Sequence, residues 1–120
     1  MDAFFLDPDV ERLPPESIRL LALHTVPLAD NCRVHVWLEL TPFQKRPEIE
    51  LTLIAPDGRT CATASIVEPM GWKLELTLHI AHRGQHPAPG TYTLTAVLTY
   101  PDLGELDRRT ATLVIPPETK

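Results

Sequence analysis

Residues 89–100, PGTYTLTAVLTY, begin with a Pro-Gly turn signal and continue with side chains that alternate between apolar and polar. A two-residue period places alternate side chains on opposite faces of an extended chain, so this segment predicts a strand with one face against a core. The side chains expected to point inward are Tyr92, Leu94, Ala96, Leu98 and Tyr100.

Six further segments follow the same pattern, at residues 17–26, 31–40, 48–54, 59–68, 72–80 and 108–115. Turn signals such as APDG at 55–58 and EPMG at 68–71 separate them. Seven short strands with turns between them predict an all-β fold, a seven-stranded antiparallel sandwich of two sheets. In the expected order, the first, second, fifth and fourth strands form one sheet.

The first segment changes phase in the middle. Ile18 and Leu20 fit the inward positions at its start, and Leu21 and Leu23 fit them afterwards. A change of phase within a strand predicts a bulge or a strand that moves between sheets.

The sandwich is expected to span residues 17–116, after an irregular arm at 1–16 and before a polar tail at 117–120. The arm carries Phe4, Phe5 and Leu6, which are costly to leave in water. They either dock on the sandwich or stay disordered, and docking is favoured.

APDG after the third strand and PxGxYxLxA at the opening of the sixth resemble bacterial immunoglobulin-like and macroglobulin-like modules over residues 47–100. The resemblance implies an immunoglobulin-like fold and places Tyr92 at the tyrosine-corner position, with its hydroxyl bonded to backbone just upstream. Leu94 stands where antibody domains have a cysteine, so antibody or receptor identity is not implied. Such modules serve adhesion, spacing, sugar binding and subunit contact alike, so the resemblance concerns the fold.

Charge and the termini narrow the function classes. A net charge of −5 and a pI of about 5.4 argue against nucleic-acid and anionic-membrane partners, which bind basic surfaces. No stretch approaches 18 consecutive apolar residues, and the N-terminus lacks the basic start of a secretory signal. The sequence therefore favours a cytoplasmic protein.

Two cysteines, Cys32 and Cys61, fall on the second and fourth strands. If both strands lie in one sheet two positions apart, their backbones are about 9.6 Å apart, beyond the reach of a disulfide. We therefore expect free, buried thiols, unless another strand order brings residue 61 opposite Cys32.

Histidines are the candidate metal ligands. Pairing the second and fifth strands with residue 31 opposite residue 81 places His35 and His79 diagonally on the outer face, with His24 possibly beside them. Imidazoles at such spacing can share a zinc ion, but Arg33 nearby would repel it, and polar residues on a wet face explain the pattern equally. No cofactor is therefore predicted.

Trp37, with Arg33 and Glu75, marks a candidate interaction face on the second and fifth strands. Exposed tryptophan is typical of interfaces and sugar sites. Either the arm or a loop covers Trp37, or it contacts a protein partner or a second copy in a homodimer, with sugar stacking as a lesser possibility.

Catalytic signals are weak. Ser17 and Ser65 lack a nucleophile-elbow context, and Glu48 and Glu50 fall on a wet strand face. The sequence thus predicts no enzyme but a non-catalytic protein-interaction or structural module. The alternative is a domain that binds a small ligand, metal or carbohydrate, on the outer face of the second and fifth strands.

Overall fold

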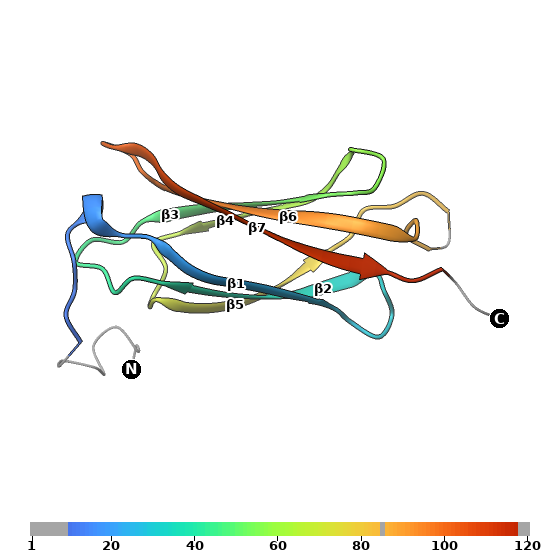
Figure 1. The fold of residues 1–120 in the computed structure, drawn as a ribbon, viewed down its shortest axis with the longest axis horizontal. Coiled ribbons are helices and arrows are strands. Elements are labelled where there is room, and N and C mark those ends of the chain that lie inside the picture. The colour runs from blue at the N-terminus through green and yellow to red at the C-terminus, as the bar shows by residue number, and fades with distance from the viewer. Residues whose placement is uncertain (1–9, 85, 118–120) are drawn as a thin grey trace.

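The computed structural model describes residues 10–84 and 86–117, and these residues form two facing antiparallel sheets (Figure 1). A short 3-10 helix, η1 (Pro15–Ser17), precedes the strands. The strands are β1 (Leu20–Pro27), β2 (Arg33–Leu40), β3 (Glu48–Ile54), β4 (Thr60–Val67), β5 (Lys73–His79), β6 (Gly90–Tyr100) and β7 (Gly104–Ile115). The predicted all-β sandwich is confirmed. Within the described ranges, no helix is long and apolar enough to span a membrane.

The sheet orders are β1-β2-β5 and β4-β3-β6-β7. The prediction that the fourth strand lies beside the fifth is therefore wrong, because β4 pairs with β3 in the other sheet. A tight turn explains this arrangement: Ala55 N donates to Arg59 O at 2.8 Å, and Gly58 N donates to Ala55 O at 2.9 Å. Gly58 adopts a φ of +89°, which glycine accepts without strain, so β3 and β4 form a hairpin.

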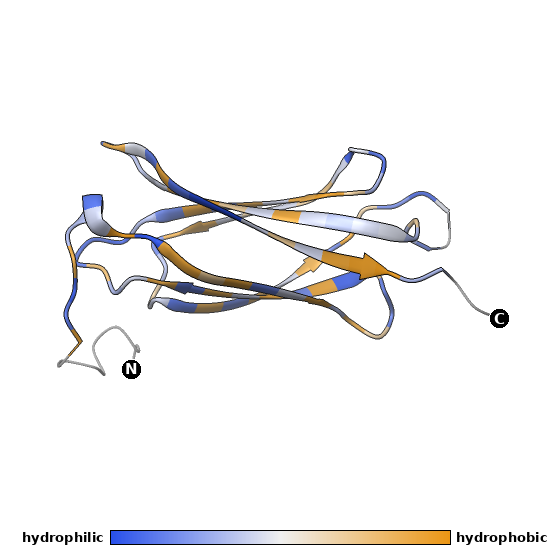
Figure 2. Ribbon diagram, viewed as in Figure 1, coloured by the Kyte–Doolittle hydropathy of each residue, from blue (hydrophilic) through white to orange (hydrophobic). Residues whose placement is uncertain are grey.

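The core lies between the two sheets and follows the alternation along each strand, which Figure 2 shows as bands of opposite hydropathy. Leu51, Leu94 and Val36 are fully buried. The Tyr92 hydroxyl donates to Ala88 O at 2.7 Å, which confirms the predicted tyrosine corner. A second buried tyrosine, Tyr100, donates to Lys45 O at 2.7 Å.

A bulge interrupts the pairing of β1 with β2 between Leu20 and Ala22. The predicted phase change is thus confirmed. Ile18, Leu20 and Leu23 are buried as expected, whereas the prediction for Leu21 is wrong, because its side chain is 48% exposed. The bulge turns Leu21 outward, so the apolar pattern alone misplaced this side chain.

One dipeptide after β5 connects the two sheets. Ile80 N donates to Cys32 O at 2.9 Å, and Ala81 N donates to Cys61 O at 2.8 Å. Both cysteines are free, as predicted. Cys61 is buried on β4, whereas Cys32 is only partly buried, just before β2. The expected reason for their separation, two strands apart in one sheet, is wrong. Cys32 directly precedes β2 and Cys61 lies on β4, and these strands belong to different sheets.

The described end of the N-terminal arm is bonded to the loop after β2. Leu13 N donates to Pro42 O at 2.9 Å, and Gln44 N donates to Leu13 O at 3.0 Å. The expected docking of Phe4, Phe5 and Leu6 falls outside the described residues, as does most of the predicted polar tail.

Candidate functional site

The outer face of the β1-β2-β5 sheet carries the residues that the sequence singled out. The predicted register between β2 and β5 is confirmed, with Arg33 opposite His79 at one end and Glu39 opposite Lys73 at the other. Between them, His35 faces Thr77 and Trp37 faces Glu75. Adjacent rows therefore carry an aromatic ring, carboxylates and basic groups on one surface.

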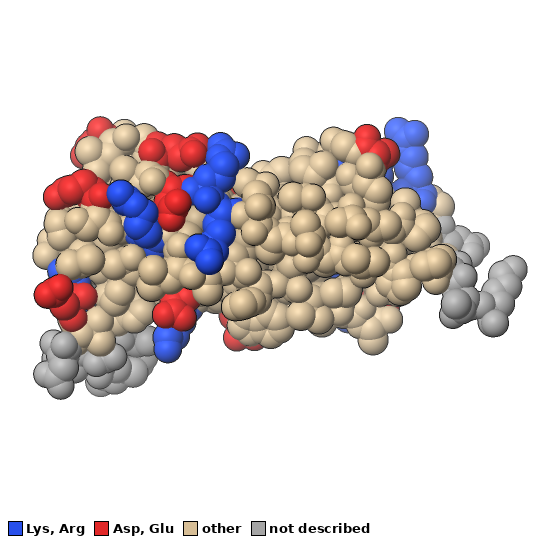
Figure 3. Space-filling model, viewed as in Figure 1, with Lys and Arg blue, Asp and Glu red and all other residues tan. Residues whose placement is uncertain are grey.

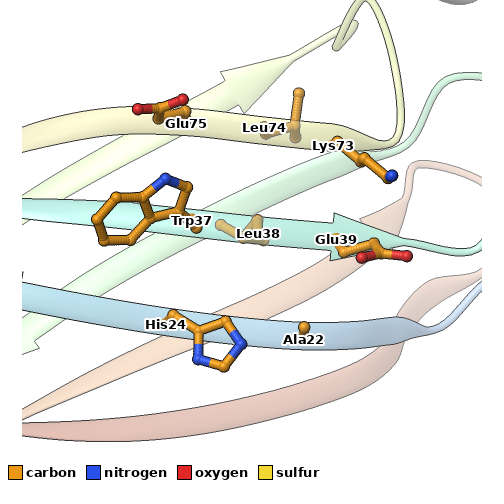
Figure 4. Close-up of a pocket in the computed structure, with 8 residues that line it drawn as sticks. All are labelled: Ala22, His24, Trp37, Leu38, Glu39, Lys73, Leu74 and Glu75. Carbon is orange, nitrogen blue, oxygen red and sulfur yellow. The ribbon is translucent and has the colours of Figure 1, made fainter.

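β1 completes this face. His24 lies opposite Trp37, and Ala22 lies opposite Glu39, so each of these rows runs across three strands. The small side chain of Ala22 and the indole of Trp37 line the same hollow, with His24 between them on β1 (Figure 4). We call this hollow the Trp37 groove; it has a volume of about 230 Å³. Its lining residues are Ala22, His24, Trp37, Leu38, Glu39, Lys73, Leu74 and Glu75.

The imidazole of His35 supports the indole, and hydrogen bonds hold that imidazole in turn. The rings of His35 and Trp37 meet edge to face, with centroids 4.3 Å apart at 63°. His35 Nε2 lies 2.5 Å from Glu75 Oε1, and His35 Nδ1 lies 3.2 Å from Thr77 Oγ1. An Nε2–H that donates to the carboxylate leaves Nδ1 to accept from the hydroxyl, so both ring nitrogens are engaged.

Trp37 remains 39% exposed. A large flat ring with a fixed orientation and open access is suited to stacking against a ligand. The part of the arm at residues 1–9, which is one of the expected covers of Trp37, lies outside the described ranges.

The three candidate metal ligands do not converge. His24 faces Trp37, His35 is bonded to Glu75 and Thr77, and His79 lies opposite Arg33. Within the ranges that the structure describes, no group of three or more His, Cys, Asp or Glu residues could hold a metal ion.

Arg33, predicted as part of the interaction face, bonds locally. Its Nε donates to Asp30 Oδ2 at 2.9 Å. Hydrogen bonds from the Cys32 backbone and from Arg33 lower the pKa of the exposed Asp30 carboxyl. Arg33 is not among the residues that line the Trp37 groove.

Glu39 and Lys73 line the groove but were not predicted as site residues. The sequence-based register already paired them one row from Trp37. If that row had been assigned to the same surface as Trp37, both residues would have been predicted as site residues. Ala22 was harder to assign, because its row depends on the bulge in β1.

Together, the fold and the groove define a β-sandwich domain with an exposed aromatic surface on its three-stranded sheet. No protein-family model matches this chain. No curated protein matches it either.

Solved structures share the sandwich. One is a glycosyl hydrolase family 2 member from Bacteroides cellulosilyticus, with 16% identity over 82% of this chain and a TM-score of 0.58. Another is the Bifidobacterium dentium β-glucuronidase complexed with coumarin-3-O-glucuronide, with 13% identity over 82% of this chain and a TM-score of 0.53. A Lactobacillus rhamnosus β-glucuronidase has 24% identity over 82% of this chain and a TM-score of 0.51.

At these identities the likeness concerns the fold. This chain matches 14%, 18% and 16% of those three chains, respectively. The similar domains thus occur within much longer glycosidase chains. These matches correct the prediction of a non-catalytic interaction or structural module, because the similar sandwiches belong to glycosyl hydrolase and β-glucuronidase chains.

Proposed function

We propose that this chain is a β-sandwich domain of a carbohydrate-active protein and that the Trp37 groove contacts a saccharide. The fixed, exposed indole of Trp37 within a row of hydrogen-bonding side chains is the observation that carries the proposal. The likeness to sandwiches within glycosidase chains supports the choice of ligand class.

The chemistry of the groove suits a sugar ring. A pyranose has an apolar face of C–H groups and a rim of hydroxyls. The indole offers a flat apolar surface, and Glu39 and Glu75 offer carboxylate oxygens that accept hydrogen bonds from hydroxyls. Lys73 and His24 add groups that donate to hydroxyl oxygens.

The size of the groove indicates how much of a ligand it holds. Its volume of about 230 Å³ is below the range of about 300–1,000 Å³ that is typical of pockets for whole small molecules. A shallow groove of this size fits one ring of a longer saccharide. The contact therefore positions a chain on the surface of the sheet.

Isothermal titration calorimetry against oligosaccharides of neutral and acidic sugars tests the proposal. We expect binding that falls at least tenfold in Trp37→Ala and less in Trp37→Phe, which keeps an aromatic face. Leu103→Ala is the matched control, because Leu103 is 48% exposed in the turn between β6 and β7. An absence of binding, or equal binding by Trp37→Ala and wild type, would refute the saccharide contact.

Several further properties belong to the same proposal. We also propose that this domain is not itself an enzyme, so purified protein should not hydrolyse aryl glycosides. The sandwich is of immunoglobulin-like type, which the sheet orders and the tyrosine corner of Tyr92 support. Three further expectations stay predictions from the sequence. They are a protein partner or homodimer, the lack of nucleic-acid and membrane binding, and a cytoplasmic location.

A further inference from the structure

A second cavity lies at the end of the sandwich where the β3–β4 turn meets the loop between β5 and β6. It has a volume of about 480 Å³ and shares no lining residue with the Trp37 groove. We call it the end cavity. Its polar lining side chains are Asp57, Arg59, His82, Arg83, His86 and Tyr92.

Hydrogen bonds and packing fix the walls of the end cavity. Arg59 N donates to Asp57 Oδ1 at 3.0 Å, which stabilises the turn before β4. The tyrosine corner of Tyr92 holds the backbone at Ala88. Gly90 packs against Pro56 so closely that an added Cβ would lie 2.8 Å from Pro56 Cγ. Contacts within the chain thus hold together two segments that are distant in sequence.

Basic groups predominate in this cavity, although the whole chain has a net charge of −5. Arg59 and Arg83 carry permanent positive charge, whereas Asp57 is the only acidic lining residue. Among the described residues, neither guanidinium forms an ion pair. Figure 3 shows acidic and basic side chains at the end formed by the β3–β4 turn. A largely uncharged surface separates them from the charged side chains at the other end of the sandwich.

Histidine adds further donors. His82 and His86 both line the cavity, and the imidazole of His82 can donate through a ring N–H. The Nδ1 atom of His82 is buried, and no described residue gives it a hydrogen-bond partner. Burying an unpaired polar atom is costly, so His82 carries an unmet hydrogen bond in a wall of the cavity.

We propose that the end cavity binds an oxyanion, the carboxylate or phosphate group of a small ligand. Guanidinium groups present paired N–H donors that match the oxygens of both groups. A concave wall of basic groups also strengthens their field at the ligand. This site is independent of the proposed saccharide contact at Trp37.

Calorimetric titration of the full chain with inorganic phosphate, D-glucuronate and D-glucose at low ionic strength tests the proposal. We expect at least one of the two anions to bind and neutral glucose not to bind here. Binding of phosphate alone identifies a phosphate ester as the ligand class, and binding of glucuronate alone identifies a carboxylate ligand. If neither anion binds, the proposal is wrong.

Variants locate the binding. We expect the double variant Arg59→Gln, Arg83→Gln to weaken anion binding at least tenfold. Arg108→Gln should bind anions as wild type does, because Arg108 lies on β7 and bonds to Glu105. Thermal melting should show that the double variant folds, since both arginines are exposed. An equal loss in Arg108→Gln would refute the assignment.

The two sites can be separated by one further variant. Trp37→Ala should leave anion binding unchanged while it removes the saccharide contact. If it weakens phosphate or glucuronate binding as much as the double variant does, the anion is bound at the Trp37 groove and the end cavity is not an anion site.

Discussion

The carboxylate of Asp107 on β7 accepts a hydrogen bond from the backbone N–H of Leu20 at the start of β1, with 2.8 Å between Asp107 Oδ2 and Leu20 N. Arg109, on the same strand, donates from Nη1 to Leu20 O at 3.1 Å. Side chains of one sheet thereby satisfy both backbone groups of a residue in the other sheet. They do so at the bulge, where the regular pairing of β1 shifts.

We expect Asp107→Ala to destabilise the fold by about 1–3 kcal/mol, because Leu20 N loses its partner in a part-buried position. Urea unfolding followed by tryptophan fluorescence measures the change. Asp102→Ala is the matched control: its carboxylate is 82% exposed and lies 3.6 Å from Lys45 Nζ. Loss of such a surface pair should cost less than about 1 kcal/mol. Equal effects of the two substitutions would contradict the role of Asp107.

Gly90→Ala should destabilise the fold by about 1–3 kcal/mol or more. Gly90 has a φ of +132°, and its added Cβ would lie 2.8 Å from Pro56 Cγ. Gly58→Ala separates strain from crowding, because Gly58 also has a positive φ, +89°, but has no atom within 4 Å of the added Cβ. We expect the smaller loss at Gly58 in thermal melting, and the reverse order would contradict the close packing of Pro56 on β6.

Tyr100→Phe should lower stability at neutral pH by about 1 kcal/mol, because it removes the hydrogen bond to Lys45 O. Burial raises the pKa of Tyr100 to about 12, whereas an unfolded tyrosine titrates near about 10. The unfolded chain therefore loses this proton first as the pH rises. This contribution to stability is complete below about pH 10 and is lost as the pH approaches about 12.

Unfolding experiments at neutral pH and above about pH 10 check this sign. The difference in stability between wild type and Tyr100→Phe should shrink with rising pH. Comparison of the two proteins at each pH cancels the titration of other groups. A difference that stays constant through this range would contradict the raised pKa of Tyr100.

The two thiols should react at different rates. Burial raises the pKa of Cys61, which also donates from Sγ to Leu53 O at 3.4 Å, whereas Cys32 is partly exposed. Because the thiolate is the reactive form, a thiol reagent should label Cys32 first. Cys32→Ser should remove the fast phase and leave the slow one, and full denaturation of wild type should expose both thiols. Equal native rates would contradict the burial of Cys61.

Sequence patterns predicted the strands because burial follows the two-residue period on β2, β3 and β6. The register of β2 with β5 could also be predicted from the sequence, since Glu39 and Lys73 make a favourable cross-strand pair. The sheet of β4 was misassigned although a signal existed. A tight turn at residues 55–58 joins adjacent antiparallel strands, so β4 had to pair with β3.

Contacts distant in sequence had no local signal. The bulge in β1 was predicted from its change of phase, but the partners that Asp107 and Arg109 give to Leu20 there lie nearly ninety residues away in sequence. The same bulge decides that His24 faces Trp37. Arg59 and Arg83 likewise line the end cavity from separate segments, and Pro56 packs against Gly90 where these segments meet.

The dipeptide Ile80–Ala81 has a mechanical consequence. It is bonded to both layers near the starts of β2 and β4, while Asp107 joins the layers at Leu20, the first residue of β1. Sliding one layer over the other would break bonds at both places. We therefore expect the two sheets to move together as one rigid unit under force, with deformation restricted to the turns.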